Sequence, residues 1–69
     1  MEVEKVSIGE NIKKLREGKN MTQEELANLV NVNQSMICQI ERGTKIPNML
    51  LAIPISEALG CSIGELYGE

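Results

Sequence analysis

The middle of the chain reads as two short helices separated by only a few residues, a spacing that few folds accommodate. The first expected helix, 22–30, begins at Thr22 with the S/T-x-x-E pattern of a capping box. Asn31 follows it, and asparagine tolerates a left-handed backbone better than other non-glycine residues do. The second expected helix, 33–42, begins with Asn33 as its N-cap. A connection of about three residues makes the second helix cross close to the first.

The small size of one residue and the left-handed backbone allowed at another make this pattern specific for two closely crossing helices. Ala27 is small where the second helix must pass close to the first, and Asn31 allows the left-handed turn between them. Apolar residues at helical spacing would pack the pair against the rest of the domain, and these are Leu26, Val30, Val32, Ile37 and Ile40. Together these features predict a helix-turn-helix unit.

Capping signals predict three more helices around this unit. Residues 7–10 have the form of a capping box, and Gly18 and Asn20 offer a left-handed stop. Gly43 would end the second central helix, and residues 62–65 form another capping box that starts a short last helix. Because there is no strand pattern, we expect an all-α fold, a compact bundle of five helices.

The expected fourth helix opens at Pro47-Asn48 and stops at Gly60. Pro54 lies inside it, where proline removes a backbone hydrogen bond and should kink or break the helix. We expect its core face to consist of Met49, Ala52, Ile53, Ser56 and Leu59. The opposite side carries Leu50, Leu51, Pro54 and Ala58, and a helix that is apolar all round is normally buried all round.

This second apolar face is the sequence feature that suggests a partner subunit. We interpret it, together with Ile63, Leu66 and Tyr67 of the short last helix, as a homodimer interface. The alternative is a few stray surface aliphatic residues, which are common on monomeric proteins.

Composition excludes several classes of protein. The 69 residues fit one domain, expected to span 1–69 with its core in about 7–67. Tyr67 is the only aromatic residue, which removes the stacking platforms used for single-stranded nucleic acid and by most RNA-binding modules. Histidine, the commonest general base, is absent, and no phosphate-binding glycine loop occurs, so we do not expect an enzyme. No apolar run approaches the roughly 20 residues of a membrane span.

The two cysteines, Cys38 and Cys61, lack the CxxC spacing of a metal site, and the chain offers no histidine to join them. We interpret them as reduced, partly buried thiols of a cytoplasmic protein. The N-terminal residues 1–8 do not resemble a signal peptide, which agrees with that location. An intersubunit disulfide, or redox control through Cys38, stays open as an alternative.

The net charge of −3 is distributed unevenly along the chain. Residues 5–45 hold all seven Lys and Arg residues against five Glu, whereas residues 46–69 hold three Glu and no basic residue. This mildly basic middle is a weak electrostatic footprint for a nucleic-acid-binding protein. It predicts modest non-specific affinity for DNA.

Over roughly residues 7–67 the chain resembles the phage-repressor-like Cro/C1-type (XRE family) helix-turn-helix DNA-binding regulators. The resemblance rests on residues 8–16 (IGENIKKLR), 22–27 (TQEELA), 37–43 (ICQIERG) and 58–62 (ALGCS). It implies a fold of the lambda-repressor-like type. The chain departs from the family pattern at Asn31, where glycine is usual, and at Pro54.

The resemblance also implies how such a domain meets double-stranded DNA. Helix 33–42 would lie in the major groove, with Gln34, Ser35, Cys38 and Gln39 at the base edges. Phosphates would be contacted by Thr22, Gln23, Asn33, Arg42 and Lys45. The residue types agree, because glutamine can pair bidentately with adenine and serine can donate or accept. The alternative is ordinary solvated polar residues on an exposed helix face.

By the same resemblance, Arg16 and Glu41 form an internal ion pair that ties the first helix to the third. Arg16 would therefore have a structural role and no direct contact with DNA. We interpret Lys13, Lys14 and Lys19 as a solvated helix face.

The resemblance thus implies a sequence-specific transcriptional regulator, and we expect a repressor that binds a palindromic operator as a homodimer, with half-sites about 34–36 Å apart. No small-molecule ligand, cofactor or metal is indicated. Prophage repressor, restriction-modification controller and antitoxin are all compatible contexts, and activation is compatible too. The alternative is a helix-turn-helix interaction or adaptor module with weak or no DNA binding, which the acidic pI of 4.9 supports.

Overall fold

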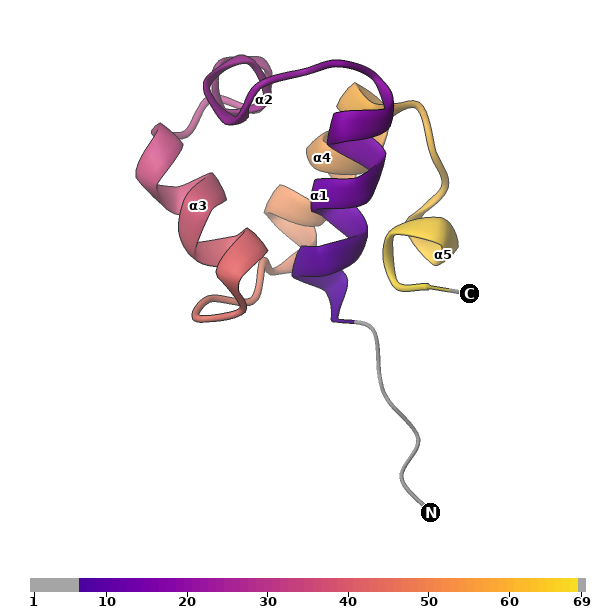
Figure 1. Cartoon of the computed structure of the whole chain (residues 1–69). Helices are drawn as coiled ribbons and strands as arrows, with labels where there is room; N and C mark the ends of the chain where they lie inside the picture. The colour runs from indigo at the N-terminus through magenta and orange to yellow at the C-terminus, as the bar shows by residue number, and fades with distance from the viewer. Residues whose placement is uncertain (1–6, 69) are drawn as a thin grey trace.

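The computed structural model describes residues 7–68, so residues 1–6 and 69 of the expected domain lie outside the described part (Figure 1). Within it the chain forms helices and no strand, which confirms the expected all-α bundle of five helices. In chain order these are α1 (Ile8–Gly18), α2 (Gln23–Leu29), α3 (Gln34–Arg42), α4 (Met49–Leu59) and α5 (Ile63–Leu66). None of the described helices is long and apolar enough to cross a membrane.

Each helix begins at a side-chain cap, as the sequence predicts. The capping residues are Ser7, Thr22, Asn33, Asn48 and Ser62, and each accepts a hydrogen bond from the backbone N–H three residues further on. These bonds satisfy N–H groups that otherwise lack a partner at a helix start. Reciprocal capping boxes form at Thr22 and Ser62, whereas in the described chain the cap at Ser7 has only the bond from Glu10.

The predicted helix ends are correct with one exception. Asn20 and Asn31 have φ of 56° and 64°, and Gly43 and Gly60 are also left-handed. Gly18 does not act as a left-handed stop, because it is the last residue of α1 and the turn falls on Asn20.

The core is aliphatic, and it joins the helix-turn-helix pair to α1, α4 and α5. The buried apolar residues are Ile12, Leu26, Ala27, Val30, Ile37, Ile40, Ala52, Ile55, Leu59 and Leu66. Ala27 lies where α2 packs on α3, as its small size predicts.

Gly9 lies at a close approach of α1 to the backbone of α3. A Cβ atom at this position would overlap the carbonyl oxygen of Ile40 and lie 3.1 Å from Cα of Glu41. Both neighbours are backbone atoms, so neither can move aside as a side chain could. The sequence identifies Gly9 only as an inner position of a capping box, and this packing role is new.

The buried face of α4 differs from the predicted one. Ala52, Ser56 and Leu59 are buried as expected, but Ile55 completes the face, while Met49 and Ile53 are exposed. The expectation for Met49 and Ile53 was wrong, because α4 is apolar on nearly every side. Apolar spacing therefore could not distinguish its inner face from its outer one.

Pro54 lies within α4 without breaking it. Proline has no N–H to donate to the carbonyl of Leu50, four residues earlier. Leu50 is 86% exposed, so water can take the place of that donor. A break near residue 54, one of the two expected outcomes, is therefore not observed.

Candidate nucleic-acid interface

The outer face of α3 carries the four residues expected to read bases. α3 buries Ile37, Ile40 and Glu41 against the bundle and lies on the side opposite α5 (Figure 1). Facing outward, Gln34 and Ser35 are exposed. Cys38 and Gln39 are half-buried, and the Gln39 amide donates a long hydrogen bond of 3.5 Å to the Ser35 hydroxyl. The structure therefore brings these four side chains onto one polar face of one helix.

Four of the five residues expected at phosphates are exposed, and these are Thr22, Asn33, Arg42 and Lys45. The Asn33 side chain accepts the N–H of Met36 through its oxygen, which leaves the amide nitrogen as a donor. Arg42 and Lys45 lie at the other end of α3. Donors and positive charge therefore lie at both ends of this polar face of α3, which is the expected reading face.

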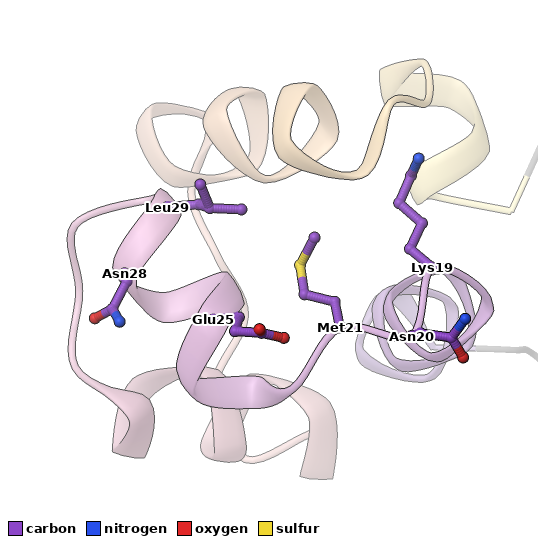
Figure 2. A pocket seen from close by; sticks show the side chains of 6 residues that line it. All are labelled: Lys19, Asn20, Met21, Glu25, Asn28 and Leu29. Carbon is purple, nitrogen blue, oxygen red and sulfur yellow. The ribbon is translucent and has the colours of Figure 1, made fainter.

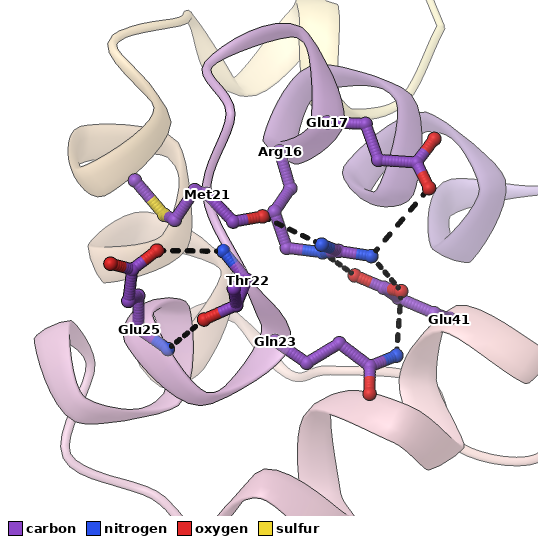
Figure 3. A network of polar contacts seen from close by, with 7 residues as sticks. All are labelled: Arg16, Glu17, Met21, Thr22, Gln23, Glu25 and Glu41. Carbon is purple, nitrogen blue, oxygen red and sulfur yellow. Dashed lines mark hydrogen bonds and ion pairs between the residues drawn. The ribbon is translucent and has the colours of Figure 1, made fainter.

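Gln23, the fifth, is placed differently from the expectation. It is half-buried, and its amide nitrogen donates to Glu41 Oε1 at 2.9 Å (Figure 3). A carboxylate only accepts hydrogen bonds, so Glu41 fixes the orientation of the Gln23 amide. Only the second N–H of that amide is left for a phosphate. Residue spacing gives no sign of this contact, which joins positions 18 apart in sequence.

The contact belongs to a buried network that includes the expected pair of Arg16 and Glu41. Arg16 donates to the two carboxylate oxygens of Glu41 at 2.7 and 3.0 Å, and the two side chains are only 9% and 3% exposed. A third donor of Arg16 reaches the carbonyl of Met21 at 2.7 Å (Figure 3). The network therefore links α1, the turn before α2, and α3.

The surroundings of Arg16 favour its charged form. Its hydrogen bond with Glu41 raises the pKa of the guanidinium above the usual range, although burial opposes this. Because the pKa is raised in the folded state, the charge of Arg16 contributes its full stabilisation of the fold at lower pH. That contribution is lost only as the pH rises through the raised pKa. Arg16 therefore stays charged throughout the neutral range.

The cysteines are both free and half-buried, in agreement with the interpretation as reduced thiols. Burial and the nearby Glu65 raise the pKa of the Cys61 thiol, while Lys19 opposes the shift. A search of residues 7–68 finds no group of three or more possible metal ligands.

Lys19 is exposed, as expected for a solvated residue, and its side chain reaches the C-terminus of α4. A Cβ atom at Gly60, the C-cap of α4, would lie 3.4 Å from the Lys19 ammonium. Residues 46–69 hold no Lys or Arg, so Lys19 supplies the positive charge that favours a helix C-terminus. Figure 2 shows its side chain directed toward α4, at one edge of a shallow hollow of about 490 Å³. The hollow is lined by Lys19, Asn20, Met21, Glu25, Asn28 and Leu29.

The other two lysines of this group, Lys13 and Lys14, are exposed on α1, as expected for a solvated face. With Glu10 and Glu17 they line a second shallow hollow on the outside of the helix.

The residues expected at a dimer interface do not share one exposed face. Leu50 and Tyr67 are exposed, Pro54 is half-exposed, and Leu66 is fully buried and offers no surface to a partner. Leu51, Ala58 and Ile63 are half-buried and pack against the core.

Five of the six exposed large apolar side chains of the described residues instead belong to α4 or to the segments before α4 and after α5. Met49, Leu50 and Ile53 share one side of α4, Ile46 is exposed in the segment before it, and the Tyr67 hydroxyl lies 3.9 Å from the Met49 sulfur. We call these five residues the α4 stripe. It replaces Leu51, Ala58, Ile63 and Leu66 as the apolar surface available to a partner.

The sequence is similar to proteins of known families. A family model described as helix-turn-helix matches residues 12–66. Multiprotein-bridging factor 1 of Candida albicans is 40% identical over 65 residues, which make up 93% of this chain and 43% of that protein. The immunity repressor protein of Bacillus phage phi105 is 30% identical over 64 residues, or 93% of this chain and 44% of the repressor. The chain thus spans less than half the length of these two relatives.

Solved structures share the fold. The P22 c2 repressor protein, in complex with a synthetic operator, superposes with a TM-score of 0.86 and 32% identity, covering 91% of this chain and 96% of the repressor chain. SinR, a master regulator for biofilm formation, in complex with DNA, gives a TM-score of 0.80 and 32% identity, covering 86% and 95% of the two chains. These matches confirm the expected repressor-type bundle.

Proposed function

The chain belongs to the helix-turn-helix family of Cro/C1-type (XRE family) regulators, and on that basis we propose that it is a sequence-specific DNA-binding transcriptional regulator, and specifically a repressor. The observation that carries the proposal is the exposed polar face of α3, with Gln34, Ser35 and Gln39 on a helix that the Arg16–Glu41 pair holds in place. The likeness to a repressor bound to a synthetic operator supports it.

In this proposal α3 lies in the major groove of double-stranded DNA and reads it through amide groups. Each glutamine that pairs bidentately with adenine contributes about 1–3 kcal/mol of discrimination against other bases. Arg42 and Lys45 at one end of α3, and Asn33 at the other, contact phosphates and fix the position of the helix without reading sequence. Occupancy of the operator is then enough to exclude polymerase.

We further propose that the regulator acts as a homodimer formed through the α4 stripe. One helix reads only a few base pairs, and two copies related by a two-fold axis would read half-sites about 34–36 Å apart. The stripe offers exposed apolar side chains on α4 and beside it, and Leu50 and Ile46 are 86% and 77% exposed. A core this small stabilises the folded chain only modestly. Burial of these apolar side chains against a second copy would stabilise the dimer further.

The cytoplasm is the proposed location of the protein. Free cysteines persist as thiols in a reducing compartment, and the two in this chain are both free.

Selection of bound duplexes from a random DNA pool, at roughly physiological salt, tests the function. We expect recovery of an inverted repeat, and loss of that enrichment in the double variant Gln34→Ala, Gln39→Ala. Asn28→Ala is a matched control, because it removes an exposed amide from α2 and leaves α3 unchanged. A pool that shows no enrichment above background would contradict the proposal.

A second candidate function is that of an adaptor that binds other proteins. The relative that is 40% identical is named a multiprotein-bridging factor, and the acidic pI of 4.9 favours weak DNA binding. The hollow beside α2 offers a surface that another protein could contact, and Leu29 is exposed at this hollow (Figure 2). Titration of the selected duplex over a range of salt separates the two candidates, since specific binding that weakens steeply with salt would exclude the adaptor.

A further inference from the structure

The turn that follows α3 folds back on a single carbonyl group. Gly43 has φ of 87° and reverses the chain. The carbonyl oxygen of Gln39 then accepts the backbone N–H of Thr44 at 3.0 Å and that of Lys45 at 3.3 Å. It also accepts the Thr44 hydroxyl at 3.1 Å.

These bonds connect two parts of the proposed DNA interface. The carbonyl belongs to Gln39, whose side chain lies on the reading face, and the last bonded N–H belongs to Lys45, which is exposed and expected at a phosphate. Residues 42–46 are all exposed, so side-chain packing does little to hold this turn. Its geometry depends on the hydrogen bonds to the Gln39 carbonyl, together with the bond from the Gly43 N–H to the Ile40 carbonyl at 3.1 Å.

The Thr44 hydroxyl is committed to this internal bond. A hydroxyl has a single hydrogen to donate, and here it points to the Gln39 carbonyl. In this arrangement Thr44 cannot also donate to a phosphate, although it is exposed beside Lys45. Its effect on DNA must therefore pass through the position of the turn.

We propose that Thr44 is a positioning residue for DNA binding, which ties the turn to Gln39 and so holds the Lys45 ammonium at a fixed place relative to the reading face. The inference rests on the proposed function, because it assigns the task of Lys45 at a phosphate. Without the hydroxyl bond the turn samples more conformations, and Lys45 meets its phosphate in only a fraction of them.

The valine variant tests this with little change in shape. Thr44→Val keeps the branched side chain and removes the hydroxyl, whereas Thr44→Ser keeps the hydroxyl. The probes are the duplex recovered by the selection above and a duplex of random sequence, each titrated over a range of salt. We expect Thr44→Val to bind the selected duplex about 3–10-fold more weakly, and the salt slope to fall by up to about one, the value for one lost phosphate contact. Thr44→Ser should restore both.

A second background shows whether Thr44 acts through Lys45. In Lys45→Met the phosphate contact is already gone, so adding Thr44→Val should cause no further loss of affinity. A loss of the same size in both backgrounds, or weaker binding with an unchanged salt slope, would overturn the inference. So would unchanged binding by Thr44→Val. Equal thermal melting of the variants shows that the fold is intact.

The wild-type chain separates this inference from the proposed function. Specific, salt-dependent binding by the wild type with no effect of Thr44→Val overturns only the role of Thr44. Failure of the wild type to bind either duplex overturns the proposed function and the inference together.

Discussion

The backbones of α1 and α3 meet at Gly9, where no room exists for a side chain. We expect Gly9→Ala to destabilise the domain by an amount at or above the upper end of the roughly 1–3 kcal/mol usual for overpacking. The reason is that the added Cβ would overlap the Ile40 carbonyl oxygen and press on the Glu41 backbone. Urea denaturation followed by circular dichroism measures the free energy of unfolding.

Gly18 in the same helix provides the matched control. A Cβ atom there meets nothing within 4 Å, and the residue has no left-handed φ. Gly18→Ala should therefore stabilise the domain by up to about 0.5–1 kcal/mol, since alanine is the better helix former. Equal effects of the two substitutions would contradict the packing role of Gly9.

Arg16 should matter far more for stability than its neighbour on the outer face of α1. We expect Arg16→Met to cost about 3–5 kcal/mol, because it leaves the buried Glu41 carboxylate without its main partner. Lys13 is exposed, so Lys13→Met should change the free energy of unfolding by less than about 0.5 kcal/mol. Thermal melting of the two variants side by side gives the comparison, and equal melting temperatures would refute the structural role of Arg16.

These residues also show what sequence reasoning could reach at this scale. Family resemblance identified Arg16 and Glu41 as partners, and the structure brings them together. The hydrogen bond from Gln23 to Glu41 and the packing of Gly9 against α3 could not be assigned in this way. Both depend on the distance between helices, which the local pattern around each residue does not contain.

At the scale of single helices, local signals predicted where α2, α3 and α5 begin and where the left-handed turns fall. The reason is that a cap and its N–H lie three residues apart, within reach of a sequence pattern. The inner face of α4 was predicted wrongly at Met49 and Ile53. That face is set by the elements packed against it, and α4 offers apolar side chains in nearly every direction.

Pro54 makes α4 less stable than the same helix would be with another residue at this position. We expect Pro54→Ala to raise the free energy of unfolding by about 2 kcal/mol. This is the roughly 3 kcal/mol by which proline disfavours a helix interior, less the roughly 1 kcal/mol it contributes by restricting the unfolded chain.

Glu57→Ala, an exposed substitution in the same helix, is the control and should change stability by less than about 0.5 kcal/mol. Denaturant titration measures both variants. A loss of stability in Pro54→Ala would show that contacts of the proline ring outweigh the missing hydrogen bond.

For the whole molecule, the α4 stripe predicts a dimer in solution. Light scattering should give a mass near twice the 7.6 kDa of one chain. The double variant Ile46→Glu, Leu50→Glu should give the monomer mass, because it places two charges where apolar side chains would be buried. Both residues are highly exposed in the single chain, so its fold should survive the change.

Leu29→Glu is the matched control for this experiment. Leu29 is also an exposed leucine, but it lies on α2 outside the stripe. It should leave the dimer intact. A dimer that survives the Ile46 and Leu50 substitutions would place the interface elsewhere on the surface.

The overall bundle was predictable from the sequence because caps, turns and apolar spacing agree with one another along most of the chain. The partner surface was predictable only in part. The excess of apolar residues on α4 was visible, but which of them face outward depends on how α4 packs against the bundle. Leu66 illustrates this, since only the folded structure shows that it is enclosed by the core.

The caps at the start of every described helix bear on the time the chain takes to fold. Each start signal acts within four residues, so helices can begin to form at several places before distant parts of the chain meet. Helical domains of this kind fold within microseconds to milliseconds. A domain with a small core opens often, and rapid refolding keeps the exposure of its aliphatic interior brief, which limits both proteolysis and aggregation.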